Sequence, residues 1–280
     1  MKPFLPPGAR EILVATVLFT AMNTLVKWLP RIPSHEIVFF RALVTMFAGA
    51  LLLWRAGLSP LGTNRPWLLA RGAFGTVALV LYFWTVQVMP LSSAVTIQYL
   101  NPLFTVLLGG LVLGERATRR QWLFFAVAFA GVPLVKGFDP RVTGLELTAG
   151  VASALFSGLA YTAIRKLRST DHPLVVVFYF SLVTVPTVGA YSAWHWVSPT
   201  ALEVILLVAV GLLTTGFQLL ITRAYQLGTA ASVSVYNYLG TVFAVAVGYG
   251  VFDEHVTLTA VAGFVLIIGG VVMATRTRSH

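Results

Sequence analysis

Long apolar runs dominate the chain, and only short charged or Pro/Gly-rich segments interrupt them. Runs of about 20 apolar residues can cross the hydrocarbon core of a bilayer, where a helix satisfies its own backbone hydrogen bonds. Because 58% of the 280 residues are apolar and 10% are charged, the sequence predicts an all-α integral membrane protein. Ten transmembrane helices are expected, near 11–29, 36–54, 67–88, 92–113, 121–138, 145–166, 173–195, 200–221, 229–251 and 257–275. The loops between them are too short to hold a soluble domain.

The basic residues are unevenly distributed over this predicted topology. Of the 19 Lys and Arg residues, fourteen fall at one membrane face, Arg71 among them, and four fall at the other. This bias follows the positive-inside rule and predicts that both termini are cytoplasmic. The formal net charge of +10 therefore reflects topology, and we expect no nucleic-acid partner.

Sequence motifs for metal, nucleotide or hydrolytic chemistry are missing. There are no cysteines, and the five histidines have no metal-ligand spacing. The sequence has no P-loop, no HExxH and no GxSxG. We therefore expect no cofactor, no bound metal and no nucleotide hydrolysis, and a membrane-embedded enzyme or receptor is the less favoured class.

A shift of 139 residues relates the two halves of the sequence. It aligns, without gaps, Lys27 with Lys166, Thr45 with Thr184, Thr76 with Thr215, Gln87 with Gln226, Glu115 with Glu254 and Gly131 with Gly270. The halves 1–139 and 140–280 hold five predicted helices each, and an odd number makes the second copy cross the membrane in the opposite direction. Inverted-topology repeats are typical of secondary transporters, which bind substrate near the midplane. The sequence thus predicts alternating access.

Polar residues recur at helical spacing in the fourth and ninth predicted helices. The fourth carries Gln98, Asn101 and Thr105, and the ninth carries Ser234, Asn237 and Thr241. An amide that faces hydrocarbon without a partner costs several kcal/mol, so these faces should turn toward a wet cavity or the bundle interior. Further candidates for the cavity wall are Tyr82, Tyr99, Tyr161, Gln218, Tyr236 and Tyr238. The alternative is that the polar groups only join helices through hydrogen bonds.

Arg41 is the one clear charge inside a predicted helix. An arginine within the membrane is by default a functional candidate, so we include Arg41 among the predicted substrate-binding residues. Its place near one end of the helix would also allow its side chain to snorkel to the interface.

Pro102 follows Asn101 inside the fourth predicted helix. Proline cannot donate to the helical hydrogen-bond ladder, so this helix should be loosened near its middle. The loosened turn could be a hinge or a tolerated kink.

Several of these features resemble the EamA family of the drug/metabolite transporter superfamily. They are the arginine in FFRAL, the fourth helix YLNPLFTVLLGGLVLGER and its weaker counterpart that ends in FDEHVT. The chain looks most like YddG-type exporters, which move amino acids, aromatic ones included, and some organic cations out of bacterial cells. The resemblance implies a transporter of the bacterial inner membrane with a central cavity built largely by the third, fourth, eighth and ninth helices. It also implies a structural role for Glu115.

We therefore predict an exporter or facilitator of small metabolites, with amino acids as the leading class. Organic cations are one alternative, and a phosphosugar or nucleotide-sugar exchanger is another. Such an exchanger would require two or more Lys or Arg at the midplane, whereas the sequence offers Arg41, with Lys27 and Lys166 nearer the helix ends. No titrating carboxylate is evident in the path, which favours facilitated diffusion over proton antiport. The oligomeric state is left open.

Overall fold

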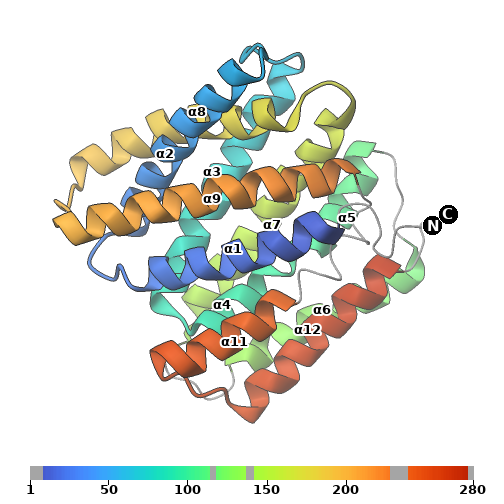
Figure 1. Cartoon of the computed structure of the whole chain (residues 1–280). Coiled ribbons are helices and arrows are strands. Elements are labelled where there is room, and N and C mark those ends of the chain that lie inside the picture. The colour runs from blue at the N-terminus through green and yellow to red at the C-terminus, as the bar shows by residue number, and fades with distance from the viewer. Residues whose placement is uncertain (1–8, 114–117, 137–141, 228–238, 277–280) are drawn as a thin grey trace.

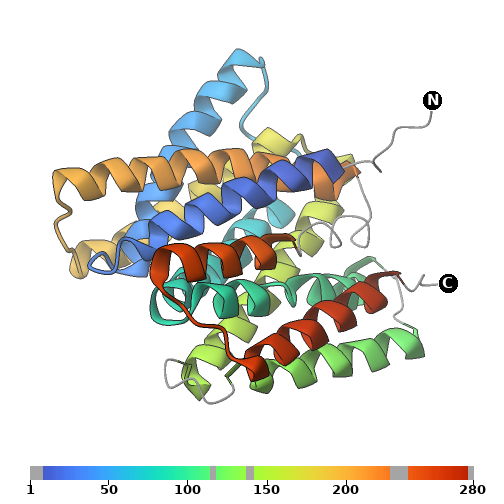
Figure 2. The same cartoon turned by 60° about the horizontal axis from the view of Figure 1, so that its bottom comes forward.

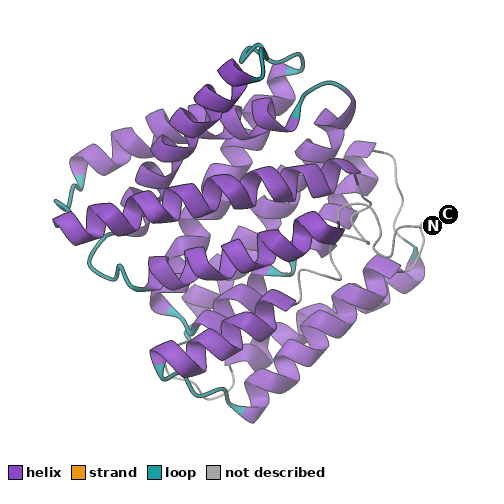
Figure 3. Cartoon of the chain, viewed as in Figure 1, coloured by secondary structure: helices purple, strands orange, loops and turns teal. Residues whose placement is uncertain are grey.

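The computed structural model describes residues 9–113, 118–136, 142–227 and 239–276, and within these ranges the protein is helical without any strand (Figure 3). The helices of the first half are α1 (Ala9–Lys27), α2 (Ser34–Arg55), α3 (Arg65–Val88), α4 (Leu91–Gln98), α5 (Asn101–Leu113) and α6 (Arg119–Lys136). Those of the second half are α7 (Gly144–Lys166), α8 (Pro173–Trp194), α9 (Ala201–Leu227), α11 (Leu239–Phe252) and α12 (Leu258–Arg276), with a 3-10 turn at Leu167–Ser169.

The described helices follow the predicted spans closely. Apart from α5, which continues α4 after a break, and α11, they begin within two residues of the expected positions. Six of the described helical segments are long and apolar enough to cross a membrane: α2, α3, α4 with α5, α7, α8 and α9. The count of ten spans stays a prediction, because α1, α6, α11 and α12 are not among these six.

The fourth predicted helix is broken near its middle. Helix α4 ends at Gln98 and α5 begins at Asn101, and Pro102 is the residue whose missing N–H would have bonded the Gln98 carbonyl. The side chain of Asn101 takes that place, since its Nδ2 donates to the Gln98 carbonyl oxygen at 2.6 Å. The break confirms the predicted loosening at Pro102.

Consecutive long helices run in opposite directions through the bundle. A cluster of buried apolar side chains joins the first turns of α1, α3 and α8 to the last turns of α2, α7 and α9. A larger cluster continues the core toward α4, α5, α6, α11 and α12. Helices α1 and α9 lie side by side, as do α6 and α12 at the edge of the bundle (Figures 1 and 2).

Two hydroxyl pairs join the halves of the molecule in a reciprocal way. The Oγ1 atoms of Thr76 on α3 and Thr184 on α8 lie 2.6 Å apart. Thr215 on α9 donates to Thr45 on α2 at 3.0 Å. Adding 139 to one pair gives the other with the halves exchanged, which is the relation that a pseudo-two-fold axis produces.

The ends of α3 and α9 show the same exchange. Gln87 Nε2 donates to the Ile32 carbonyl oxygen at 2.8 Å, and Gln226 Nε2 donates to the Asp171 carbonyl oxygen at 3.2 Å. Ile32 and Asp171 are again 139 residues apart. Each glutamine therefore holds the loop between the first two helices of its own half.

Helices α6 and α12 cross at two glycines that correspond to one another. A Cβ atom at Gly131 would lie 2.7 Å from the Gly263 carbonyl oxygen, and one at Gly270 would lie 2.7 Å from the Phe124 carbonyl oxygen. Only glycine allows the two backbones to approach this closely.

Candidate functional site

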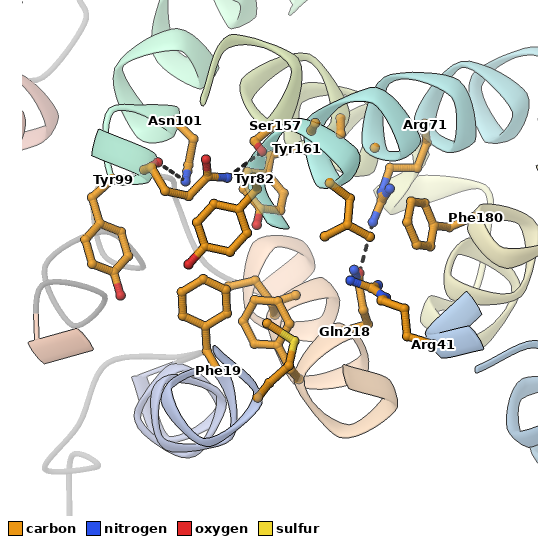
Figure 4. A pocket seen from close by; sticks show the side chains of 18 of the residues that line it. Phe19, Arg41, Arg71, Tyr82, Tyr99, Asn101, Ser157, Tyr161, Phe180 and Gln218 are labelled. Atoms are coloured by element: carbon orange, nitrogen blue, oxygen red, sulfur yellow. Dashed lines mark hydrogen bonds between the residues drawn. The ribbon is translucent and has the colours of Figure 1, made fainter. Parts of the chain in front are cut away.

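A cavity lies inside the bundle and is walled by α1, α2, α3, the α4–α5 break, α7, α8 and α9 (Figure 4). Its volume is about 70 Å³. Seven of the predicted substrate-binding residues line it: Arg41, Tyr82, Gln98, Tyr99, Asn101, Tyr161 and Gln218. The remaining three, Tyr236, Asn237 and Tyr238, lie outside the described residues.

One end of the cavity is cationic. The side chains of Arg41 on α2 and Arg71 on α3 are buried, with 1% and 2% of their surface exposed. Their Cζ atoms lie 5.5 Å and 4.6 Å from the centroid of the Phe180 ring on α8, so both guanidinium groups make cation–π contacts with that ring (Figure 4). Two charges from the first half thus contact one aromatic ring from the second.

The prediction that Arg71 lies at the membrane face is wrong, because its side chain is buried and lines the cavity. Its Nη2 donates to Gln218 Oε1 at 3.0 Å across the interface between α3 and α9. Gly75 makes room for this inward orientation, because a Cβ there would clash with the Arg71 guanidinium and would lie 2.8 Å from the Phe180 ring. Arg41 does not snorkel either, since it is fully enclosed and faces the cavity.

Four guanidinium nitrogens have no hydrogen-bond partner within the described part of the chain. They are Nε and Nη2 of Arg41 and Nε and Nη1 of Arg71, and all four are buried. Among the described lining residues there is no Asp, Glu or His. The cationic end of the cavity therefore has donors and positive charge to offer to a solute.

Aromatic side chains form the middle of the cavity. Phe19 stacks on Tyr82 with ring centroids 5.6 Å apart, and it also contacts Phe217 at 4.9 Å. Tyr161 stacks on Tyr225 at 4.6 Å. The Tyr82 hydroxyl is buried and lies next to the Asn23 side chain. This section can hold an apolar or aromatic body and offers one phenol for hydrogen bonding.

The other end of the cavity carries amides, and their roles differ. Gln98 Nε2 donates to Ser157 Oγ at 2.7 Å, and Gln98 Oε1 accepts from Ser153 Oγ at 3.0 Å. Gln98 therefore joins α4 to α7, as the helix-joining alternative predicts. Asn101 uses its Nδ2 at the helix break, and its Oδ1 is buried without a partner in the described part.

The family models match both halves of the chain. The profile of the EamA-like transporter family matches residues 8–136 and 145–276. The chain belongs to the EamA-like transporter family. It is therefore a multi-pass membrane transporter of small metabolites, and the coarser resemblance found in the sequence is confirmed.

Three relatives of this EamA-like chain cover nearly its whole length. The pseudopaline exporter CntI of Pseudomonas aeruginosa is 34% identical, over 98% of each chain. The S-adenosylmethionine uptake transporter of Rickettsia prowazekii is 24% identical, over 93% of this chain and 90% of its own. Human solute carrier family 35 member G1 is 27% identical, over 93% of this chain and 76% of its own. These relatives are not YddG-type exporters, so that finer resemblance stays a prediction.

A solved crystal structure supports the fold of this EamA-like chain. It superposes with a TM-score of 0.68 at 19% sequence identity, over 95% of this chain and 96% of the other. A likeness at this level of identity concerns the fold alone.

Sequence reasoning missed Arg71, Phe180 and Phe19. Arg71 lies four residues inside the predicted helix 67–88, and two glycines, Gly72 and Gly75, follow it. An arginine beside small residues on one helical face is a signal for a guanidinium that packs inward. Phe180 and Phe19 gave no such signal, because apolar positions in a membrane helix look alike in sequence.

Proposed function

We propose that this EamA-like chain is a secondary transporter that moves small amphipathic metabolites by alternating access, with amino acids, including aromatic ones, as the leading class. The observation that carries the proposal is the cavity lined by residues of both halves, 1–139 and 140–280, with a cationic end, an aromatic middle and an amide end. Such a cavity matches the carboxylate, side chain and polar groups of an amino acid.

The direction and energetics of transport are part of the same proposal. The 34% identical relative is named as an exporter, so we propose export across the inner membrane of a bacterium, with both termini in the cytoplasm. The described cavity wall carries no titratable carboxylate or histidine. This favours facilitated diffusion or exchange over coupling to protons.

The structure strengthens one alternative that the sequence disfavoured. An anion exchanger was expected to need two or more basic residues near the midplane, and Arg41 and Arg71 now provide two in the cavity. Solutes with more than one negative charge are therefore included in the proposal beside ordinary amino acids.

Counterflow in proteoliposomes tests the proposed function. Purified protein would be loaded with unlabelled solute, and labelled tryptophan, phenylalanine, threonine or alanine would be added outside without an ion gradient. Pseudopaline and S-adenosylmethionine, the solutes named for the relatives, complete the panel. Accumulation of an amino acid above that in empty liposomes supports the proposal. Failure of every amino acid, with folded protein, overturns the amino-acid class, and accumulation of a named relative's solute alone would replace it.

Phe19→Ala makes the test specific for this cavity. Removing the ring that contacts Tyr82 and Phe217 should raise the KM for tryptophan and phenylalanine about three- to tenfold, with a smaller effect on alanine. Phe47→Ala is the matched control, because Phe47 is 65% exposed on α2. Equal effects of both substitutions would remove the aromatic middle from the transport path.

A further inference from the structure

We propose that Arg41 and Arg71 form a binding site for a dicarboxylate, so that the preferred solute carries two carboxylate groups on an apolar body. The inference rests on the proposed transport function and narrows its substrate class. It starts from two buried positive charges that face one cavity and share one aromatic ring.

Within the described residues, neither arginine has an acidic partner to balance its charge. The described acids with printed partners are bound elsewhere: Glu254 contacts Lys27, Glu203 contacts Arg31, and the backbone N–H groups of Val197, Thr143 and Thr63 donate to Glu36, Glu146 and Asp171. Outside the described residues, segment 228–238 contains no Asp or Glu, whereas Glu115 and Asp139 fall in the segments 114–117 and 137–141. Because a buried unpaired charge costs several kcal/mol, an anion from outside the chain is the natural complement.

A purely structural role would leave fewer donors free. Arginines that only join helices bond carbonyl oxygens or acids, whereas these two keep four buried nitrogens without a partner in the described part. Gln218 binds one nitrogen of Arg71, and the Nε and Nη1 atoms of that guanidinium are buried without a hydrogen-bond partner in the described part. A guanidinium edge with two N–H groups matches a carboxylate in a bidentate way.

The geometry favours two carboxylates over one. Since the two Cζ atoms lie 5.5 Å and 4.6 Å from the same ring centroid, they are no more than about 10 Å apart. Two like charges at this separation in a low-dielectric site repel each other, and a dianion relieves that repulsion more fully than a monoanion does. Phe19 and Tyr82 then offer a stacked surface for an apolar body, and Asn101 Oδ1 accepts a hydrogen bond beyond it.

Isothermal titration calorimetry on the purified full chain in low-chloride buffer tests the site. The probes share a phenyl ring and differ in charge: phenylsuccinate with two carboxylates, 3-phenylpropionate with one, 3-phenylpropanamide with none, and phenyl phosphate as a dianionic phosphomonoester. We expect phenylsuccinate to bind at least tenfold more tightly than 3-phenylpropionate, and added chloride to weaken it. Equal affinity of these two, or tighter binding of phenyl phosphate, overturns the dicarboxylate assignment.

Substitutions locate the binding in the arginine pair. Arg41→Gln and Arg71→Gln should each weaken phenylsuccinate about tenfold, while Arg41→Lys and Arg71→Lys should retain its preference over 3-phenylpropionate. Arg55→Gln is the matched control, because Arg55 lies exposed on the same helix as Arg41. Wild-type affinity in both glutamine variants overturns the proposal. If a variant fails to fold, the comparison of probes on the wild-type chain still decides.

The two proposals fail in different ways. If amino acids show counterflow but binding does not depend on the charge of the probe, the dicarboxylate site is overturned and the proposed transport function stands. Charge-dependent binding without counterflow of any solute would support the site and overturn the transport proposal.

Discussion

The helix contacts that join the two halves repeat, whereas most residues around the cavity do not. Thr76 with Thr184 and Thr215 with Thr45 are reciprocal pairs at the 139-residue shift. In the cavity the same shift relates unlike residues: Arg41 with Phe180, Gln218 with Leu79, and Tyr161 with Met22, all of which line its wall. The contacts between the halves therefore keep the same residues in both repeats, whereas these positions of the cavity wall do not.

The proposed alternating access would explain the difference. If each half adopts the conformation of the other during transport, the contacts between halves must serve in both arrangements, which favours identical pairs. A bound solute has no two-fold symmetry, so the cavity gains specificity when its counterpart residues differ. The replacement of a cation by an aromatic ring at Arg41 and Phe180 gives the cavity a charged end.

The largest expected effect tests the repeated glycines of α6 and α12. Gly131→Ala and Gly270→Ala should each lower the free energy of unfolding by about 2–3 kcal/mol, because the new Cβ would lie 2.7 Å from a backbone oxygen of the facing helix. Denaturant titration in micelles measures both. Similar losses support equivalent halves, and a loss at only one glycine would break the comparison.

Gly269→Ala is the matched control for this pair. A Cβ at Gly269 has no atom of another residue within 4 Å, and alanine favours the helix by up to about 1 kcal/mol over glycine. We therefore expect this variant to be as stable as the wild type or more stable.

The sequence predicted the scaffold better than the cavity for a physical reason. Helix ends follow from the length of apolar runs, and the break at Pro102 follows from a missing N–H, so both can be derived locally. The place of Arg71 depends on Gly75 and on Phe180, which is about 110 residues away in sequence and is brought close by packing. Hydropathy alone treats an arginine near a helix end as interfacial, and this was the error.

Gln98 also shows that the sequence alone does not give the partner of a polar side chain. Its position in a polar stripe predicted a substrate contact, and the structure still places it along the cavity wall. Both ends of its amide, however, are bound by Ser153 and Ser157 on α7. A polar residue in a membrane helix must find a partner, but only the fold decides whether that partner is a solute or a neighbouring helix.

An effect of intermediate size, on access to the cavity, is expected from the ion pair Lys27–Glu254, which joins the two halves at one end of the bundle. Lys27 Nζ lies 2.5 Å from Glu254 Oε1 and donates to the Met89 carbonyl oxygen, while Leu91 N donates to Glu254 Oε2. The counterpart at the shift of 139 would be Lys166 with Glu115, and Glu115 lies outside the described residues. The Lys27–Glu254 pair should hold this end closed, because breaking it leaves a partly buried charge unpaired.

The accessibility of an introduced cysteine measures whether this end of the cavity is closed, since the chain has no native cysteine. With Ala160→Cys as a reporter in the cavity wall, Glu254→Gln should raise the rate of modification by a membrane-impermeant thiol reagent about tenfold from the face that carries Glu254. Glu203→Gln breaks the more exposed Arg31–Glu203 pair at the same end and should change the rate less than about threefold. Equal rates in both variants would contradict the closing role of Glu254.

The smallest expected effect is the coupling energy of the two threonine pairs, which tests whether the contacts of the two halves are equally strong. In double-mutant cycles with Thr→Val substitutions, the pair Thr76–Thr184 and the pair Thr45–Thr215 should each show a coupling energy of about 0.6 kcal/mol, which is typical of hydrogen bonds between membrane helices. Unfolding in micelles gives the four free energies of each cycle. Thr187→Val is the control, because the Thr187 hydroxyl bonds carbonyl oxygens of its own helix. Equal couplings would extend the equivalence of the halves from geometry to energy; a coupling confined to one pair would show that the repeat retains the contact but not its strength.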